Sequence, residues 1–271
     1  MTTGGKLRLE QVTKRFDVAG ARPTIALQDF TLAAAQGEFL VIVGPSGCGK
    51  TTVLNILAGL ERPTSGSVAI DDRPIVAPGP ERGVMFQDYA LFPWQTVHGN
   101  VEFGLRRGPA GRDLDATARE QRVKSCIDLV GLTGAEMKYP HQLSGGMRQR
   151  VALARLMAME PEVLLMDEPL AALDAQTRII LQDELLRIWG QDRLAAERRT
   201  VVFITHAIDE AVFLADRVAV MTTHPGRLKA LIDVPLPRPR SDATRASPEF
   251  QALSQHIWSL IRDEAYRAIV T

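Results

Sequence analysis

Cysteine is scarce in this chain. Of the 271 residues only Cys48 and Cys126 carry thiols, which argues against a disulfide framework and favours a reducing, cytoplasmic compartment. There is also no net charge, because 32 Lys and Arg residues balance 32 Asp and Glu residues, so nothing indicates a nucleic-acid partner. No apolar run is long enough to cross a membrane, and residues 1–12 do not resemble a leader peptide. We therefore expect a soluble chain that reaches a membrane only through a partner.

What the chain does contain is an alternation of short apolar strands and helices. Phe39–Val43 and Val163–Met166 are continuous apolar runs, which is typical of buried parallel strands. Residues from about 96 to 159 have helical spacing instead. The fold class predicted is α/β, with a parallel sheet core, early antiparallel-looking strands and a mostly helical insert. Further strands are expected at 7–12, 25–33, 67–70, 83–87, 200–205 and 217–222, and further helices at 49–58, 117–130, 145–159, 174–190 and 207–214.

A glycine-rich segment follows the strand Phe39–Val43. It reads Gly44-Pro45-Ser46-Gly47-Cys48-Gly49-Lys50-Thr51, then Thr52, and matches the phosphate-loop pattern G-x-x-x-x-G-K-[ST]. Glycines let the backbone wrap around phosphates, and the new helix directs its unpaired N–H groups at the anion. We expect Lys50 to bridge the β- and γ-phosphates of ATP and the Thr51 hydroxyl to ligate Mg²⁺.

A pair of acids ends the second apolar run, at Asp167 and Glu168. A buried parallel strand delivers its terminal carboxylates to the carboxyl edge of the sheet, where ligands bind. Asp167 is therefore expected in the Mg²⁺ shell, and Glu168 is expected to act as the general base on the attacking water.

A third motif, Leu143-Ser144-Gly145-Gly146-Met147, is followed by Arg148-Gln149-Arg150. It resembles the signature motif of the ABC ATPases, with Met147 where Gln is usual. Ser144 and the two glycines open a helix and so present a second phosphate-facing N-terminus.

Other segments resemble the remaining ABC elements, in the family's order. Gln87 resembles the glutamine that contacts Mg²⁺ and water and senses the permease. Ala172-Leu173-Asp174 resembles the D-loop, which contacts the partner subunit. His206 resembles the switch histidine on the γ-phosphate, and Phe16 stands where the family stacks an aromatic ring on adenine.

The resemblance implies an ATPase that works as a pair, with ATP and Mg²⁺ as ligands. ATP on the phosphate loop of one copy would meet Ser144, Gly145 and Gly146 of a second copy, or of a similar subunit. The other partners implied are a membrane permease and, indirectly, an external substrate-binding protein, with the chain on the cytoplasmic face of the inner membrane. Residues 1–234 are expected to form the ABC domain, and 235–271 a Pro-rich connector with a C-terminal helix.

Two stretches narrow the resemblance to the ATPases of nitrate, sulfonate and taurine importers. They are Gly79–Trp94 and the connector Leu236-Pro237-Arg238-Pro239-Arg240. They indicate a small anion as cargo. The alternatives are an importer of another small molecule, an ABC ATPase acting on DNA or ribosomes, and a small-molecule kinase. The absence of a long heptad segment between the phosphate loop and the signature motif disfavours the DNA-repair type.

Two further expectations concern single side chains. Cys48 lies beside a helix N-terminus and Lys50, so a lowered thiol pKa and inhibition by alkylation are expected. Tyr89, Leu91, Phe92 and Trp94 form an aromatic, apolar cluster that fits either a permease-binding surface or packing inside the helical insert.

Overall fold

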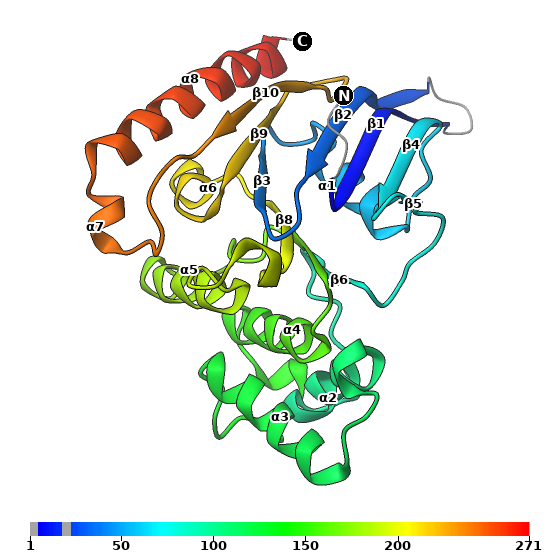
Figure 1. The fold of residues 1–271 in the computed structure, drawn as a ribbon, viewed down its shortest axis with the longest axis vertical. Helices are drawn as coiled ribbons and strands as arrows, with labels where there is room; N and C mark the ends of the chain where they lie inside the picture. The colour runs from blue at the N-terminus through cyan, green and yellow to red at the C-terminus, as the bar shows by residue number, and fades with distance from the viewer. Residues whose placement is uncertain (1–4, 18–22, 271) are drawn as a thin grey trace. The chain divides into compact units, whose positions relative to one another are not determined.

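A computed structural model of the chain describes residues 5–17 and 23–270, with side chains up to Glu264. The described chain forms two compact units, one of residues up to 78 together with 182 onward, the other of residues 79–181. Figure 1 traces them from the blue N-terminal strands to the red C-terminal helix. Each unit is described below by itself.

The first unit contains the parallel strands of the predicted core. β3 (Phe39–Val43) pairs in parallel with both β8 (Thr200–Ile204) and β9 (Arg217–Met221), and β10 (Leu228–Asp233) runs antiparallel to β9. β3 and β8 are buried throughout, as expected for β-branched and apolar runs covered on both faces.

A second sheet of this unit is antiparallel. Its order is β2-β1-β4-β5, with β1 (Leu7–Phe16) central to the pairing of β2 (Thr24–Ala34) and β4 (Ser65–Ile70), and with the short β5 (Arg73–Pro74) at one edge. In Figure 1 these are the blue and cyan arrows. The prediction of an α/β fold with a parallel core and an antiparallel subdomain is confirmed.

Helices of the first unit start and end where the local sequence dictates. α1 (Lys50–Ala58) ends at Gly59, which takes the left-handed φ of 78° that favours glycine. α8 (Pro248–Val270) begins after Ser247, whose Oγ accepts a hydrogen bond from the Phe250 N–H at 3.2 Å. α8 packs on α6 (Ile208–Leu214) and β9. The remaining helical segments are α7 (Asp242–Arg245) and the short turn Ala195–Glu197.

The second unit is mostly helical. β6 (Arg82–Met85) and β7 (Val163–Asp167) pair in parallel, while α2 (Val97–Arg107), α3 (Ala116–Leu129) and α4 (Gly145–Met159) pack on one another. Helix α5 (Ala175–Trp189) follows β7, and its residues from Gln182 onward belong to the first unit. Short 3₁₀ turns occur at Pro109–Gly111 and Pro140–Gln142.

Among the elements that the sequence did not predict, α2 and β10 were missed for identifiable reasons. α2 carries Gly99 and Gly104, which weaken helical propensity. A Cβ on Gly104 would overlap the carbonyl oxygen of Arg155, so glycine there permits the close packing of α2 on α4. β10 is only half-buried and has no continuous apolar run, so nothing marked it as a strand.

Candidate nucleotide site

The phosphate loop lies where β3 ends and α1 begins. Gly47 and Gly49 have φ values of 76° and 98°, a region that side chains rarely adopt. A Cβ on Gly49 would lie 2.8 Å from the carbonyl oxygen of Ala26, so β2 lies directly against this point of the loop. Gly49, which precedes α1, makes no side-chain cap bond, and the partial positive charge of a helix N-terminus favours an anion at this point.

The ammonium group of Lys50 lies on the loop itself. Its Nζ donates to the carbonyl oxygens of Gly44 and Pro45, both at 2.8 Å, and the side chain is buried. Ser46 and Gly47 are exposed in the same loop, as is Thr51 at the start of α1. The backbone of this glycine-rich loop, here called the glycine cradle, thus carries the Lys50 ammonium at its side. A chain of phosphates fits such a loop.

The pKa of the Cys48 thiol differs from the sequence expectation. Cys48 is buried in the loop, and burial raises its pKa more than the neighbouring Lys50 lowers it. The expectation of a lowered pKa is wrong because the loss of solvation of the buried thiolate outweighs the effects of the helix start and of Lys50. A thiol of this kind is mostly protonated at neutral pH.

His206 shares an edge of the sheet with the phosphate loop. Ile42 of β3 pairs with Ile204 of β8, and the Thr205 N–H donates to the Ile42 carbonyl at 3.3 Å. Since both strands run in parallel, Gly44 and His206 leave the sheet at the same carboxyl edge. The His206 side chain is exposed there.

Phe16 ends β1, where its ring is half-buried. The Lys14 ammonium lies 4.7 Å from the centre of the Phe16 ring, a cation–π contact. The ring is therefore an accessible aromatic surface in the antiparallel sheet of the first unit, the same sheet whose strand β2 lies against Gly49.

The turn between β9 and β10 supports the phosphate loop, and no sequence motif marked it. His224 lies beside Gly47, since a Cβ on that glycine would be 3.6 Å from the imidazole Nε2. Glu264 of α8 holds this turn, accepting from the Thr223 N–H at 3.2 Å and pairing with the Lys229 Nζ at 2.8 Å. The C-terminal helix is therefore bonded to a turn next to the glycine cradle.

In the second unit β7 carries the two acids. Asp167 is buried at the end of the strand, and Glu168 follows it with a φ of 48°. A left-handed backbone at a residue other than glycine costs about 1–2 kcal/mol, and such strain is typical of functional sites. Glu168 is only half-buried. Asp167 is thus buried, whereas the adjacent Glu168 is partly exposed.

Ser144 caps α4 as predicted, with its Oγ accepting from the Met147 N–H at 3.3 Å. Gly145 and Gly146 follow in the first turn, where Gly146 lies close to the Leu173 side chain. Asp174 caps α5, because its Oδ1 accepts from the Thr177 N–H at 3.0 Å. That bond lowers the pKa of Asp174, whose carboxylate is exposed.

Gln87 lies two residues beyond β6 and not at its end, which corrects the strand boundary expected from the sequence. Its side chain is exposed. Tyr89 and Ala90 then take left-handed φ values of 64° and 42°. Arg155 of α4 stabilises this loop by donating to the carbonyl oxygens of both residues, at 2.8 and 2.7 Å. Nothing in the sequence marked Arg155 for this task.

A family model and several known proteins match this chain. The family model described as "ABC transporter" matches residues 27–171. An ABC transporter ATP-binding protein of Methanocaldococcus jannaschii, of uncharacterised function, is 48% identical over 97% of this chain and 94% of its own. The nitrate import ATP-binding protein NrtD of Synechococcus elongatus is 45% identical over 92% of this chain and 89% of its own.

Two more similarities bear on the site. The aliphatic sulfonates import ATP-binding protein SsuB of Bacillus licheniformis is 46% identical over 88% of each chain. A solved dimeric ATP-binding cassette, MJ0796, in a post-hydrolysis state with ADP and Pi, has a TM-score of 0.74. It is 32% identical over 84% of this chain and 98% of its own. The chain therefore belongs to the ABC transporter family, and it is an ATP-binding, ATP-hydrolysing subunit of that class.

Proposed function

We propose that this chain hydrolyses ATP to drive the import of a small anion through a separate permease. The observation that carries the proposal is its near-equal similarity, over most of both chains, to a nitrate import and an aliphatic sulfonates import ATP-binding protein. Among the described residues no helix is both long and apolar enough to cross a membrane. A permease chain would therefore provide the path, with this chain bound on its cytoplasmic face and an external binding protein delivering the cargo.

The proposed nucleotide-binding residues of the first unit are the loop Gly44–Thr52, with Phe16 against the adenine. Lys50 would exchange its carbonyl partners for the β- and γ-phosphates, and His206 would contact the γ-phosphate from the same sheet edge. Mg²⁺ suits a site of this kind, because it is usually bound by one or two protein oxygens together with phosphates. In this unit the Thr51 hydroxyl would hold the ion, which neutralises charge on the phosphates. Asp167 and Gln87 are proposed as its other ligands from the family resemblance alone.

The proposed base is Glu168, whose half-exposed carboxylate can accept a proton from water. Ser144, Gly145, Gly146 and Asp174 would contact ATP, or the loop that binds it, from a second copy. Ser144 supports this assignment because it stands exposed at a helix N-terminus, where the partial positive charge favours phosphate.

Replacing Glu168 by Gln is expected to lower kcat by about a hundredfold or more while ATP still binds, because only the base is lost. Replacing Lys50 by Ala is expected to weaken ATP binding by at least about tenfold, because a charge-assisted contact to phosphate is lost. Steady-state hydrolysis and equilibrium ATP titration measure the two effects. Glu184→Gln, at a half-buried side chain of α5 that pairs with Arg187, is the matched control. Rapid turnover by Glu168→Gln would contradict the assignment.

The aromatic cluster after Gln87 is the proposed permease contact. Trp94 is 71% exposed and lies 5.6 Å from Phe92, measured between ring centres, while Phe92 packs on Phe103 of α2 at 4.5 Å. Asn100 is fully buried and fixes this loop by bonding to the backbone of Phe92, Gln95 and Thr96. A rigid loop that presents a large exposed indole supports the surface interpretation.

Trp94→Ala is therefore expected to abolish permease-coupled transport while ATP hydrolysis by the isolated subunit stays within about twofold of wild type. The physical reason is that the substitution removes a contact area without opening a cavity. Transport in reconstituted vesicles and ATPase activity in solution are the two measurements. Trp258→Ala, at an indole 55% exposed on α8, is the control. Parallel loss of folding and ATPase activity in Trp94→Ala would favour the core interpretation.

The cargo class is tested in cells. A strain lacking this chain is expected to lose growth on an alkanesulfonate as sole sulfur source or on nitrate as sole nitrogen source, and the wild-type chain restores it. The Lys50→Ala chain, which should not bind ATP, should not restore growth. Normal uptake of both anions alongside lost uptake of a sugar or peptide would contradict the cargo assignment and leave the ATPase assignment intact.

A further inference from the structure

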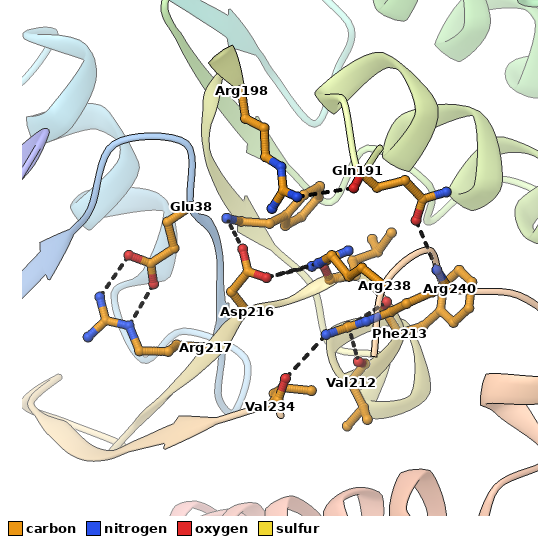
Figure 2. A network of polar contacts seen from close by, with 12 residues as sticks. Glu38, Gln191, Arg198, Val212, Phe213, Asp216, Arg217, Val234, Arg238 and Arg240 are labelled. Atoms are coloured by element: carbon orange, nitrogen blue, oxygen red, sulfur yellow. Dashed lines mark hydrogen bonds and ion pairs between the residues drawn. The ribbon is translucent and has the colours of Figure 1, made fainter. Parts of the chain in front are cut away.

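The chain after β10 returns along α6 and buries two arginines against it. Figure 2 shows Arg238 and Arg240 between the α6 residues Val212 and Phe213, the connector residue Val234, and Asp216. Arg240 is only 4% exposed. This connector is the Pro–Arg segment singled out in the sequence, and the nucleotide site described above does not use it.

Arg240 binds the last turn of α6. Its Nη1 donates to the carbonyl oxygens of Val212 and Phe213 at 2.8 and 2.7 Å, and its Nη2 donates to that of Val234 at 3.3 Å. Arg238 adds a bond from Nη2 to the Leu214 carbonyl at 2.8 Å. The carbonyls of Val212, Phe213 and Leu214 belong to the end of α6, where intrahelical donors are lacking and a cation is favoured.

Burial of Arg240 is unfavourable for its charge. Desolvation and the nearby Arg238 lower its pKa to about 9, although Asp216 acts in the opposite direction. The hydrogen-bond acceptors found for Arg240 are carbonyl oxygens, while Asp216 pairs with Arg238 at 2.8 Å. A buried charge generally adds less to the free energy of unfolding than well-packed apolar atoms would. We therefore expect the main effect of Arg240 to be on the geometry of the backbone that it binds.

The first turn of α6 is held as well. Glu210 accepts a bond from the Gln182 Nε2 of α5 at 3.2 Å, and Arg245 of α7 donates to the Gln182 Oε1 at 3.0 Å. The Arg245 guanidinium also lies 3.4 Å from the ring centre of Phe213. The C-terminal segment therefore contacts α6 directly at its last turn and, through Gln182, at its first.

Only Ala207 separates His206 from the first residue of α6. The Ala207 N–H donates to the Thr205 Oγ1 at 3.0 Å, and the Ala207 carbonyl accepts from the Ala211 N–H at 3.0 Å. The backbone of His206 is thus continuous with the helix, so a shift of α6 moves the imidazole relative to the sheet edge. Thr205, buried and bonded to β3, is the fixed point on the other side.

We propose that Arg240 is a positioning residue for ATP hydrolysis, which acts through α6 on His206. The proposal rests on the proposed function of His206 at the γ-phosphate. It makes the Pro–Arg connector part of the hydrolysis machinery and not a passive extension of the domain.

The test measures ATP hydrolysis by the purified full chain. Arg240→Gln is expected to lower kcat about fivefold while KM for ATP stays within about twofold, because positioning of His206 acts on the transition state and not on nucleotide binding. Arg240→Lys, which keeps a donor and the charge, is expected to recover part of the loss. Arg262→Gln, at an exposed arginine of the same C-terminal segment, is expected to behave as wild type.

The decisive comparison is made in the His206→Ala background. If Arg240 acts through His206, adding Arg240→Gln to His206→Ala lowers kcat no further. An equal fivefold loss in both backgrounds, or a fall in thermal stability that tracks the fall in kcat across the variants, overturns the proposal. Full activity of His206→Ala alone would instead contradict the proposed role of the histidine.

Should Arg240→Gln not fold, Arg240→Lys takes its place. It keeps the charge but has a single terminal nitrogen, so it cannot reproduce all three bonds from Nη1 and Nη2 to carbonyl oxygens. A drop in kcat that disappears in the His206→Ala background supports the proposal, and a drop that persists there overturns it.

Discussion

The parallel pairing of β3 with β8 and β9 is the constraint on which the nucleotide site of the first unit depends. Residue-by-residue pairing from Phe39 to Val43 fixes the heights at which the strands end. The glycine loop leaves one strand and His206 leaves its neighbour, so the loop that carries Lys50 and the His206 imidazole lie at the same edge of the sheet. All five residues of β3 and of β8 are buried, and a slip in register would therefore be opposed by the whole core.

The opposite edge of this sheet is held by charge. Glu38 precedes β3 and accepts from the Arg217 Nε and Nη2 at 2.6 and 2.8 Å. Asp216 accepts from the Phe39 N–H at 2.9 Å and from Arg238 of the connector. Figure 2 shows how these pairs adjoin the arginines that bind α6. The strands are thus fixed at the edge away from the phosphate loop, and the C-terminal segment shares in that fixation.

The parts of this molecule that the sequence predicts well are those in which one local signal determines the outcome. The apolar runs of β3 and β7 and the Ser144 cap of α4 all occur where their residues predict. α2 was missed because its glycines lower the helical propensity of the segment, while Gly104 is needed for close packing against Arg155. Asn100, Arg155 and Arg240 were missed because each bonds to backbone carbonyls, which every sequence possesses, so no partner residue signals the contact.

For Cys48 the sequence predicts the right neighbours but the wrong direction of the pKa shift. A helix start and Lys50 do lower its pKa, but burial raises it more, and burial depends on β2 and the β9–β10 turn, far away in the chain. The same limit applies to the motifs themselves. They locate candidate site residues within each unit, but a local motif does not show how residues far apart in the chain are brought together.

The central claim is that a phosphate loop and a signature helix act together across two copies of the chain. Mixing the Lys50→Ala and Ser144→Ala variants tests it, because a mixed pair would keep one undamaged combination. With random pairing about half of the dimers are mixed, and each mixed dimer has one undamaged site of two. If the sites work independently, the account predicts that the mixture recovers about a quarter of wild-type ATPase activity. Mixing Lys50→Ala with Glu168→Gln should recover no activity. Lys50 and Glu168 of one copy would serve the same ATP, so each site of a mixed pair would carry one of the two damaging changes. No recovery with Ser144→Ala, or equal recovery in both mixtures, would contradict the account.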